Sequence, residues 1–115
     1  MKENVIKEKS FLFALDIIKL YKKLQEQREF ILSKQLLRIW TSIGANIEEA
    51  LAWQSRRDFL SKISISSKEA RETKYWLKLL KESWITDIDY KKYIKEAHEI
   101  ANILAKIVKT TSETI

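Results

Sequence analysis

Proline is absent from this 115-residue chain, and glycine occurs once, at position 44. Turns, hairpins and β-bulges depend on these two residue types, whereas the abundant Leu, Ile, Lys and Glu favour long helices. We therefore predict an all-α fold. A chain of this length fits one domain, so we expect residues 1–115 to form a single unit.

Apolar residues recur at helical spacing in four segments of the chain. The predicted helices cover residues of about 7–27, 34–53, 57–83 and 90–109. Short connections between amphipathic helices make neighbouring helices antiparallel, with Ser33 and Ser55 as expected N-caps of the second and third. The predicted architecture is an antiparallel up-down-up-down four-helix bundle.

Each predicted helix has one apolar stripe for the core. In the second helix, steps of four and three select Leu36, Trp40, Ile43, Ile47 and Ala50. In the third, they select Phe59, Ile63, Ser66, Ala70, Thr73, Leu77 and Leu80. The middle of this third stripe is small, which predicts close approach by Gly44 and Ala45.

The first helix has a broader apolar face. Phe13, Ile17, Leu20 and Leu24 form its stripe, and Ile18 lies beside it. A face this wide suits a helix that contacts two neighbours, or one neighbour and another subunit.

Positive charge is concentrated in the third helix. Residues 56–81 contain eight basic and three acidic residues, so they contribute +5 of the net charge of +6. A line along this helix carries the candidate nucleic-acid-binding residues Arg71, Lys74, Tyr75, Lys78 and Lys81. Such a line can follow a phosphate backbone, with the aromatic ring as a stacking surface. The alternative is an ordinary solvated helix face.

A second set of polar residues lies between the second and third helices. Arg38, Ser42 and Asn46 follow one another at steps of four, and Glu69 and Glu72 stand beside the apolar seam of the third helix. A guanidinium can pair with these carboxylates inside the bundle and fix the helix register. The alternative is that these charges reach solvent.

No catalytic, metal or cofactor site is predicted. Cysteine is absent, a single glycine builds no phosphate-binding loop, and one histidine, His98, cannot supply a di-iron site. The two E-x-x-E pairs, Glu69 with Glu72 and Glu96 with Glu99, weakly resemble those of magnesium-dependent all-α nucleotide pyrophosphatases, which remain a distant alternative. We expect neither a signal peptide nor a membrane span, and a cytoplasmic location.

Much of the chain resembles the four-helix bundle proteins encoded by intervening sequences in bacterial 23S rRNA genes. The residues that carry the resemblance are Arg38, Ser42, Ile43, Gly44, Ala45, Asn46, Ile47, Glu49, Ala50, Asp58, Phe59, Lys62, Lys68, Glu69, Ala70, Glu72, Thr73, Trp76 and Leu77. Ile39 and Trp40 depart from the family pattern, which has small residues there. We expect Trp40 either to change local packing or to fill a gap between subunits.

The resemblance implies a homopentamer. It also implies a relation to accessory proteins of diversity-generating retroelements, which are basic pentamers that bind nucleic acid and a reverse transcriptase. The leading hypothesis is a non-enzymatic homo-oligomer that binds RNA or DNA through the basic face of the third helix. The rival hypothesis is a structural or protein-binding scaffold whose charge only confers solubility.

Overall fold

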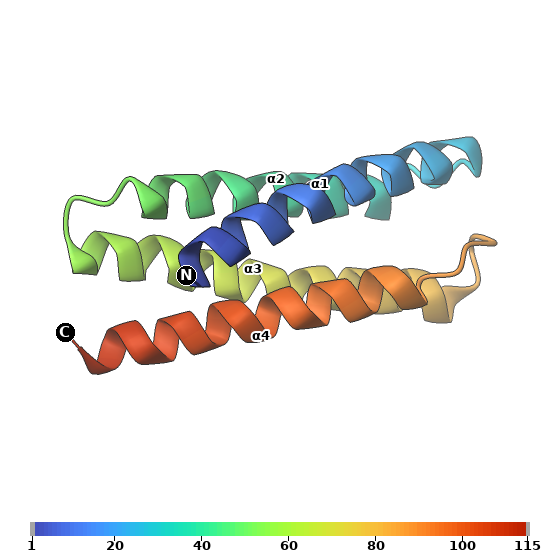
Figure 1. Cartoon of the computed structure of the whole chain (residues 1–115). Coiled ribbons are helices and arrows are strands. Elements are labelled where there is room, and N and C mark those ends of the chain that lie inside the picture. Colours follow the sequence, from blue (N-terminus) through green and yellow to red (C-terminus); the bar gives the residue numbers. More distant parts are fainter. Residues whose placement is uncertain (1, 115) are drawn as a thin grey trace.

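The computed structural model describes residues 2–114, and Met1 and Ile115 of the expected domain lie outside the described residues. It contains four helices and, within the described range, no strand (Figure 1). The helices are α1 (Lys2–Glu26), α2 (Leu32–Leu51), α3 (Arg56–Ser83) and α4 (Lys91–Glu113). The prediction of an all-α four-helix bundle is confirmed. None of these helices is long and apolar enough to cross a membrane.

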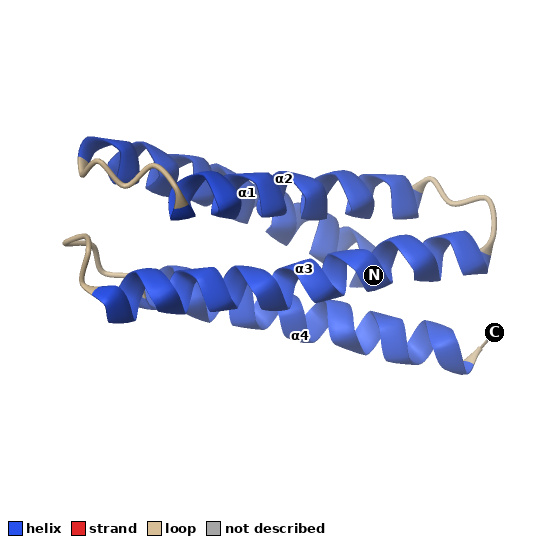
Figure 2. Cartoon of the chain, turned by 180° about the vertical axis from the view of Figure 1, so that it is seen from behind, coloured by secondary structure: helices blue, strands red, loops and turns tan. Residues whose placement is uncertain are grey.

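The helix connections alternate between the two ends of the bundle. Figure 1 shows the α1–α2 and α3–α4 connections at one end, with the α2–α3 connection and both chain ends at the other. Side-chain contacts agree, since the Arg56 guanidinium at the start of α3 donates to Thr114 Oγ1 at 2.7 Å. Neighbouring helices therefore run antiparallel, as Figure 2 also shows from behind.

The helices pack in the cyclic order α1, α2, α3, α4. The largest interface joins α2 to α3, and the smallest joins α1 to α4. The predicted stripes of α2 and α3 are buried in full. Helix α4 buries Ala97, Ile100, Leu104 and Ile107, and its N-cap residue Tyr90 is buried as well. In α1 the stripe from Phe13 to Leu24 is buried, but Ile18 is 42% exposed. The broad face of α1 is thus only partly covered within one chain.

The helix bounds differ from the predicted ones mainly at the two ends of the chain. Helix α1 begins at Lys2 and not near Lys7, and α4 continues to Glu113 and not only to Lys109. The segment added to α4 is polar, so apolar periodicity carries little information about it. The segment added to α1 contains Ile6, which is fully buried and which the predicted bounds missed. The backbone hydrogen bonds of both segments extend the helices.

One of the two predicted N-caps is correct. Ser55 caps α3, because its hydroxyl accepts a hydrogen bond from the Asp58 N–H at 3.1 Å. Ser33 is wrong as a cap, since it is buried inside the first turn of α2. The Glu29 carboxylate instead accepts hydrogen bonds from the N–H groups of residues 31–33, at 2.6–3.1 Å. A carboxylate near a helix N-terminus satisfies these otherwise unpaired donors and favours the helix dipole.

Trp40 joins α2 to α1 in the core. Its side chain is 1% exposed, and its indole N–H donates to the Ser10 carbonyl at 3.1 Å. Its ring meets Phe13 edge to face, with 4.5 Å between the ring centroids. The tryptophan is therefore buried within one chain, where it cannot fill a gap between subunits.

The predicted close approach at Gly44 is also wrong. A Cβ atom placed on Gly44 would meet nothing within 4 Å, and Ala45 is exposed. On the α3 side, Ser66 Oγ donates instead to the carbonyl of Ile43, the residue before Gly44, at 3.3 Å. Each helical residue is rotated by roughly 100° from the one before, so Gly44 faces away from α3. No contact among the described residues explains the glycine.

Candidate nucleic-acid interface

The basic line of α3 lies beside the buried stripe of the helix, along the edge next to α4. Arg71, Lys78 and Lys81 are exposed, Lys74 is half-buried, and Tyr75 is 58% exposed. Steps of three and four residues keep the four cations on one face of the helix, beside the core stripe. The structure therefore brings together all five candidate residues along one surface.

Lys74 is held in place by a contact with α4 that periodicity did not predict. Its ammonium group lies 2.9 Å from His98 Nδ1, and the Asn102 side-chain amide lies 3.1 Å from His98 Nε2. An ammonium group can only donate, so Nδ1 is the acceptor of the Lys74 contact. His98 is exposed, and this contact places it at the edge of the basic surface.

The cations of this surface are not neutralised by carboxylates. The ion pairs found among the described side chains join Lys7 to Glu48 and Lys62 to Glu49, each at 3.8 Å. None of the four cations on the α3 face lies within ion-pair distance of a carboxylate in that part of the chain. The face therefore presents its positive charge to solvent, where it can attract a polyanion.

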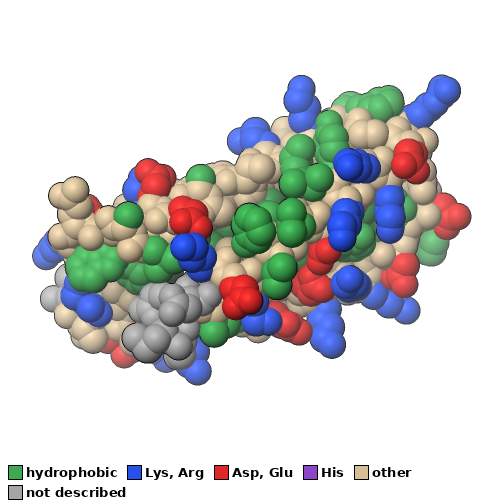
Figure 3. All heavy atoms as spheres, turned by 45° about the horizontal axis from the view of Figure 1, so that its top comes forward, with side chains coloured by type: hydrophobic (Ala, Val, Ile, Leu, Met, Phe, Trp, Pro, Cys, Tyr) green, Lys and Arg blue, Asp and Glu red, His purple; other side chains and the backbone are tan. Residues whose placement is uncertain are grey.

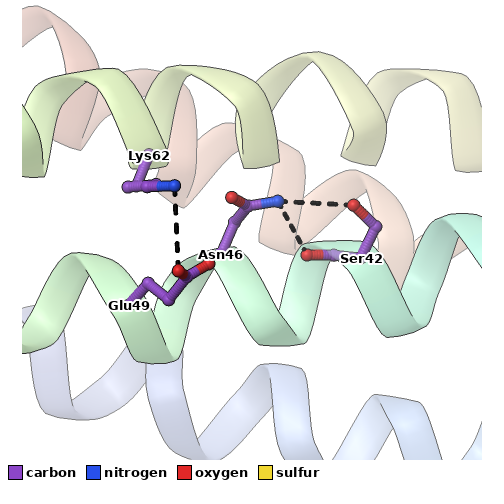
Figure 4. Close-up of polar contacts among 4 residues, drawn as sticks. All are labelled: Ser42, Asn46, Glu49 and Lys62. Atoms are coloured by element: carbon purple, nitrogen blue, oxygen red, sulfur yellow. Dashed lines mark hydrogen bonds and ion pairs between the residues drawn. The ribbon is translucent and has the colours of Figure 1, made fainter.

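Three members of the predicted polar network meet at the α2–α3 interface. Ser42 Oγ donates to Glu69 Oε1 at 2.9 Å. The Asn46 side-chain amide donates to the Ser42 carbonyl at 3.0 Å and contacts its hydroxyl at 3.3 Å, and Lys62 pairs with Glu49 one turn further along (Figure 4). The Ser42–Glu69 and Lys62–Glu49 contacts join α2 to α3 along one edge of their interface. The role of this network is therefore structural.

Arg38 and Glu72 lie outside this network. Both side chains are exposed, and the Arg38 guanidinium donates to Gln35 Oε1 on its own helix at 2.7 Å. The predicted ion pair between Arg38 and Glu69 or Glu72 is therefore wrong. Burying a charge costs several kcal/mol unless its geometry is excellent, and a position at the solvent edge of α2 avoids that cost.

The carboxylates of the two E-x-x-E pairs do not face one another. Glu69 accepts a hydrogen bond from Ser42, whereas Glu96 lines a hollow between α1 and α4 together with Asp16. Within residues 2–114 no three acidic or histidine side chains are placed to hold a metal ion. This arrangement offers no support for the pyrophosphatase alternative. Burial and the neighbouring Asp16 carboxylate raise the pKa of Glu96.

Because the pKa of Glu96 is raised, we expect Glu96→Gln to increase the free energy of unfolding by an amount that depends on pH. A carboxyl with a raised pKa in the folded state stabilises the fold at pH values below its ordinary pKa, and this contribution is lost as pH rises through the raised value. At pH near 7 the neutral glutamine should therefore raise the free energy of unfolding by up to about 0.5 kcal/mol, the range of surface substitutions. Urea unfolding near pH 7 and at about pH 3.5 measures the difference. An equal increase in the free energy of unfolding at both pH values would show that the raised pKa of Glu96 is not its cause.

The fold and surface define the class of this protein as a four-helix bundle with one uncompensated basic helix face. The chain belongs to the 23S rRNA-intervening sequence protein family, whose model matches residues 2–106. It is also similar to a solved structure, that of a protein of unknown function from the S23 ribosomal protein family of Bacteroides thetaiotaomicron VPI-5482. The two chains are 50% identical over 95% of this chain and 99% of that one, with a TM-score of 0.88. No curated protein matches the sequence.

Proposed function

We propose that this protein is a cytoplasmic, non-enzymatic homo-oligomer that binds nucleic acid through the basic face of α3. The observation that carries the proposal is the line of four uncompensated cations from Arg71 to Lys81, with exposed Tyr75 among them. Ten residues of helix span roughly 15 Å. That length matches about four successive phosphates along one strand in B-form geometry, at about 3.4 Å of helix axis each, so each cation can lie near one phosphate of the same strand.

Two features of α1 and α2 support self-association. The exposed apolar side chains of α1 are Val5, Phe11, Leu12, Leu15 and Ile18. Figure 3 shows hydrophobic side chains gathered in a band on the face that includes α1. A glycine inside a helix costs about 1 kcal/mol relative to alanine, and the open space beside Gly44 would accommodate close packing by a second copy.

A ring would strengthen binding by repetition. One basic face with four cations binds weakly, but several copies joined in a closed assembly bind one strand with a high effective concentration. The family resemblance implies five subunits, and a head-to-tail interface that closes on itself generates such a ring.

The proposal is tested by light scattering and by a salt titration of nucleic-acid binding. We expect a mass several times that of the 13.7 kDa chain. With four phosphate contacts, the slope of log affinity against log salt should be about −3 for a single strand. A monomer would contradict the assembly. An oligomer that binds neither single strands nor duplex at low salt would contradict nucleic-acid binding and favour the scaffold hypothesis.

A further inference from the structure

Trp84, at the C-terminal end of α3, is poorly explained by folding. It is the C-cap residue and adopts a left-handed conformation, with φ 57° and ψ 23°. Helices commonly place glycine in this conformation, because a Cβ atom makes it unfavourable. The Trp84 side chain is also 85% exposed, so it contributes little buried surface in return. A strained and exposed aromatic residue suggests a function outside the fold.

The position of Trp84 continues the basic face of α3. Trp84 follows Lys81, the last of the four cations, by three residues, and both line one hollow between the end of α3 and the start of α4. Ile88, Tyr90 and Lys91 form other parts of its wall. The hollow therefore has an aromatic and apolar part of its lining directly beside the row of cations on α3 that can attract phosphates.

The charges of the hollow itself favour an uncharged occupant. Three acidic residues, Glu82, Asp87 and Asp89, also line it, and they repel a phosphate group. A nucleobase carries no charge and has a π-face that stacks on an indole ring. Phosphates would lie outside the hollow along α3, and a base would lie against Trp84.

We propose that Trp84 is a stacking platform for an unpaired nucleobase, so that the preferred ligand is single-stranded nucleic acid. This inference rests on the proposed function, because α3 supplies the phosphate contacts. Bases inside a duplex are already stacked and cannot reach the indole, whereas those of single strands and loops can. Tyr75, which is also exposed, offers a second ring roughly 13 Å away along the helix.

The test is Trp84→Gly, for which stability and binding should change in opposite directions. Glycine relieves the left-handed conformation, so Tm should rise by about 4 °C. Affinity for oligo(dT) of about 15 nucleotides should fall about tenfold, and affinity for a duplex of equal length should stay the same. A loss of binding combined with a gain in stability cannot result from misfolding. Fluorescence anisotropy of labelled oligonucleotides and thermal unfolding measure the two effects.

Two control variants separate stacking from other roles. Trp84→Phe keeps an aromatic ring and should retain most of the affinity for oligo(dT). Trp53→Leu removes an indole that is 48% exposed just after α2, in the connection at the opposite end of the bundle, and should change that affinity by less than about twofold. A Trp53→Leu variant that loses as much as Trp84→Gly would overturn the inference.

The outcomes also distinguish this inference from the proposed function. If Trp84→Gly binds oligo(dT) as well as the wild type, while charge reversal on α3 abolishes binding, the stacking role is overturned and the proposed function stands. If Trp84→Gly lowers the mass measured by light scattering, Trp84 is a subunit contact and the inference is likewise overturned. If the wild type binds no nucleic acid at low salt, the proposed function fails and the stacking role fails with it.

Discussion

Replacing Trp40 with alanine should lower the free energy of unfolding by about 3–5 kcal/mol. The indole is 1% exposed, so its removal leaves a large cavity between α1 and α2. The variant also loses the hydrogen bond to the Ser10 carbonyl and the edge-to-face contact with Phe13. Small domains are stable by only about 5–15 kcal/mol, so this loss should bring the protein close to unfolding at room temperature. Urea unfolding followed by circular dichroism measures it.

The matched control for this core variant is Trp53→Ala. Trp53 is 48% exposed and contacts Phe59 edge to face, with 6.5 Å between the ring centroids. Removing it should cost less than removing Trp40, because about half of the indole is already exposed and the aromatic pair adds only about 0.5–1.5 kcal/mol to the effect of its buried area. Both variants need the same protein concentration, because assembly contributes to apparent stability. A loss below about 1 kcal/mol for Trp40→Ala would show that α1 does not depend on this anchor.

Reversing the charges of Lys74, Lys78 and Lys81 to glutamate should lower nucleic-acid affinity by about 100-fold at low salt. Three contacts worth about 1 kcal/mol each correspond to about that factor. The salt slope should also become less steep by about 2, since each phosphate contact to a single strand contributes about 0.7. Anisotropy titrations at several salt concentrations measure both quantities.

A control variant separates local contacts from net charge. It reverses one exposed lysine on each of the other three helices, Lys19, Lys34 and Lys106. Each Lys→Glu change lowers the net charge by two, because a positive charge is replaced by a negative one. Both triple variants therefore change the net charge from +6 to 0. We expect the control to keep most of the affinity and the slope. Equal losses in the two variants would mean that the whole molecule attracts the polyanion and that α3 is not its binding face.

The helical architecture was predictable because each helix repeats its apolar residues with a regular period. The heptad from Phe59 to Leu80 is buried without exception, and the stripe from Leu36 to Ala50 is buried as well. The same argument placed the cations of α3 correctly at the surface, because residues outside a buried stripe face solvent. Periodicity was less informative at Ile18, which is apolar and yet 42% exposed within one chain.

The contacts between particular side chains were less predictable. Arg38 was expected to meet Glu69, but Ser42 provides the donor, since it lies nearer to α3 on the surface of α2. The Lys74–His98 contact joins residues 24 positions apart on different helices, and no spacing within either helix encodes it. The strained conformation of Trp84 depends on how the chain leaves α3, and tryptophan is not a residue that signals such a position.

The residue order alone thus predicts which side of each helix is buried and which helix carries the positive charge. Both properties follow from the order of residues along one helix and its period of 3.6. The contacts of residues at the helix edges depend instead on how the four helices pack together. The orientation of α2 about its axis turns Gly44 away from α3 and Arg38 toward solvent, and it brings Ser42 to Glu69. That orientation depends on packing against the neighbouring helices, including the packing of Trp40 against α1.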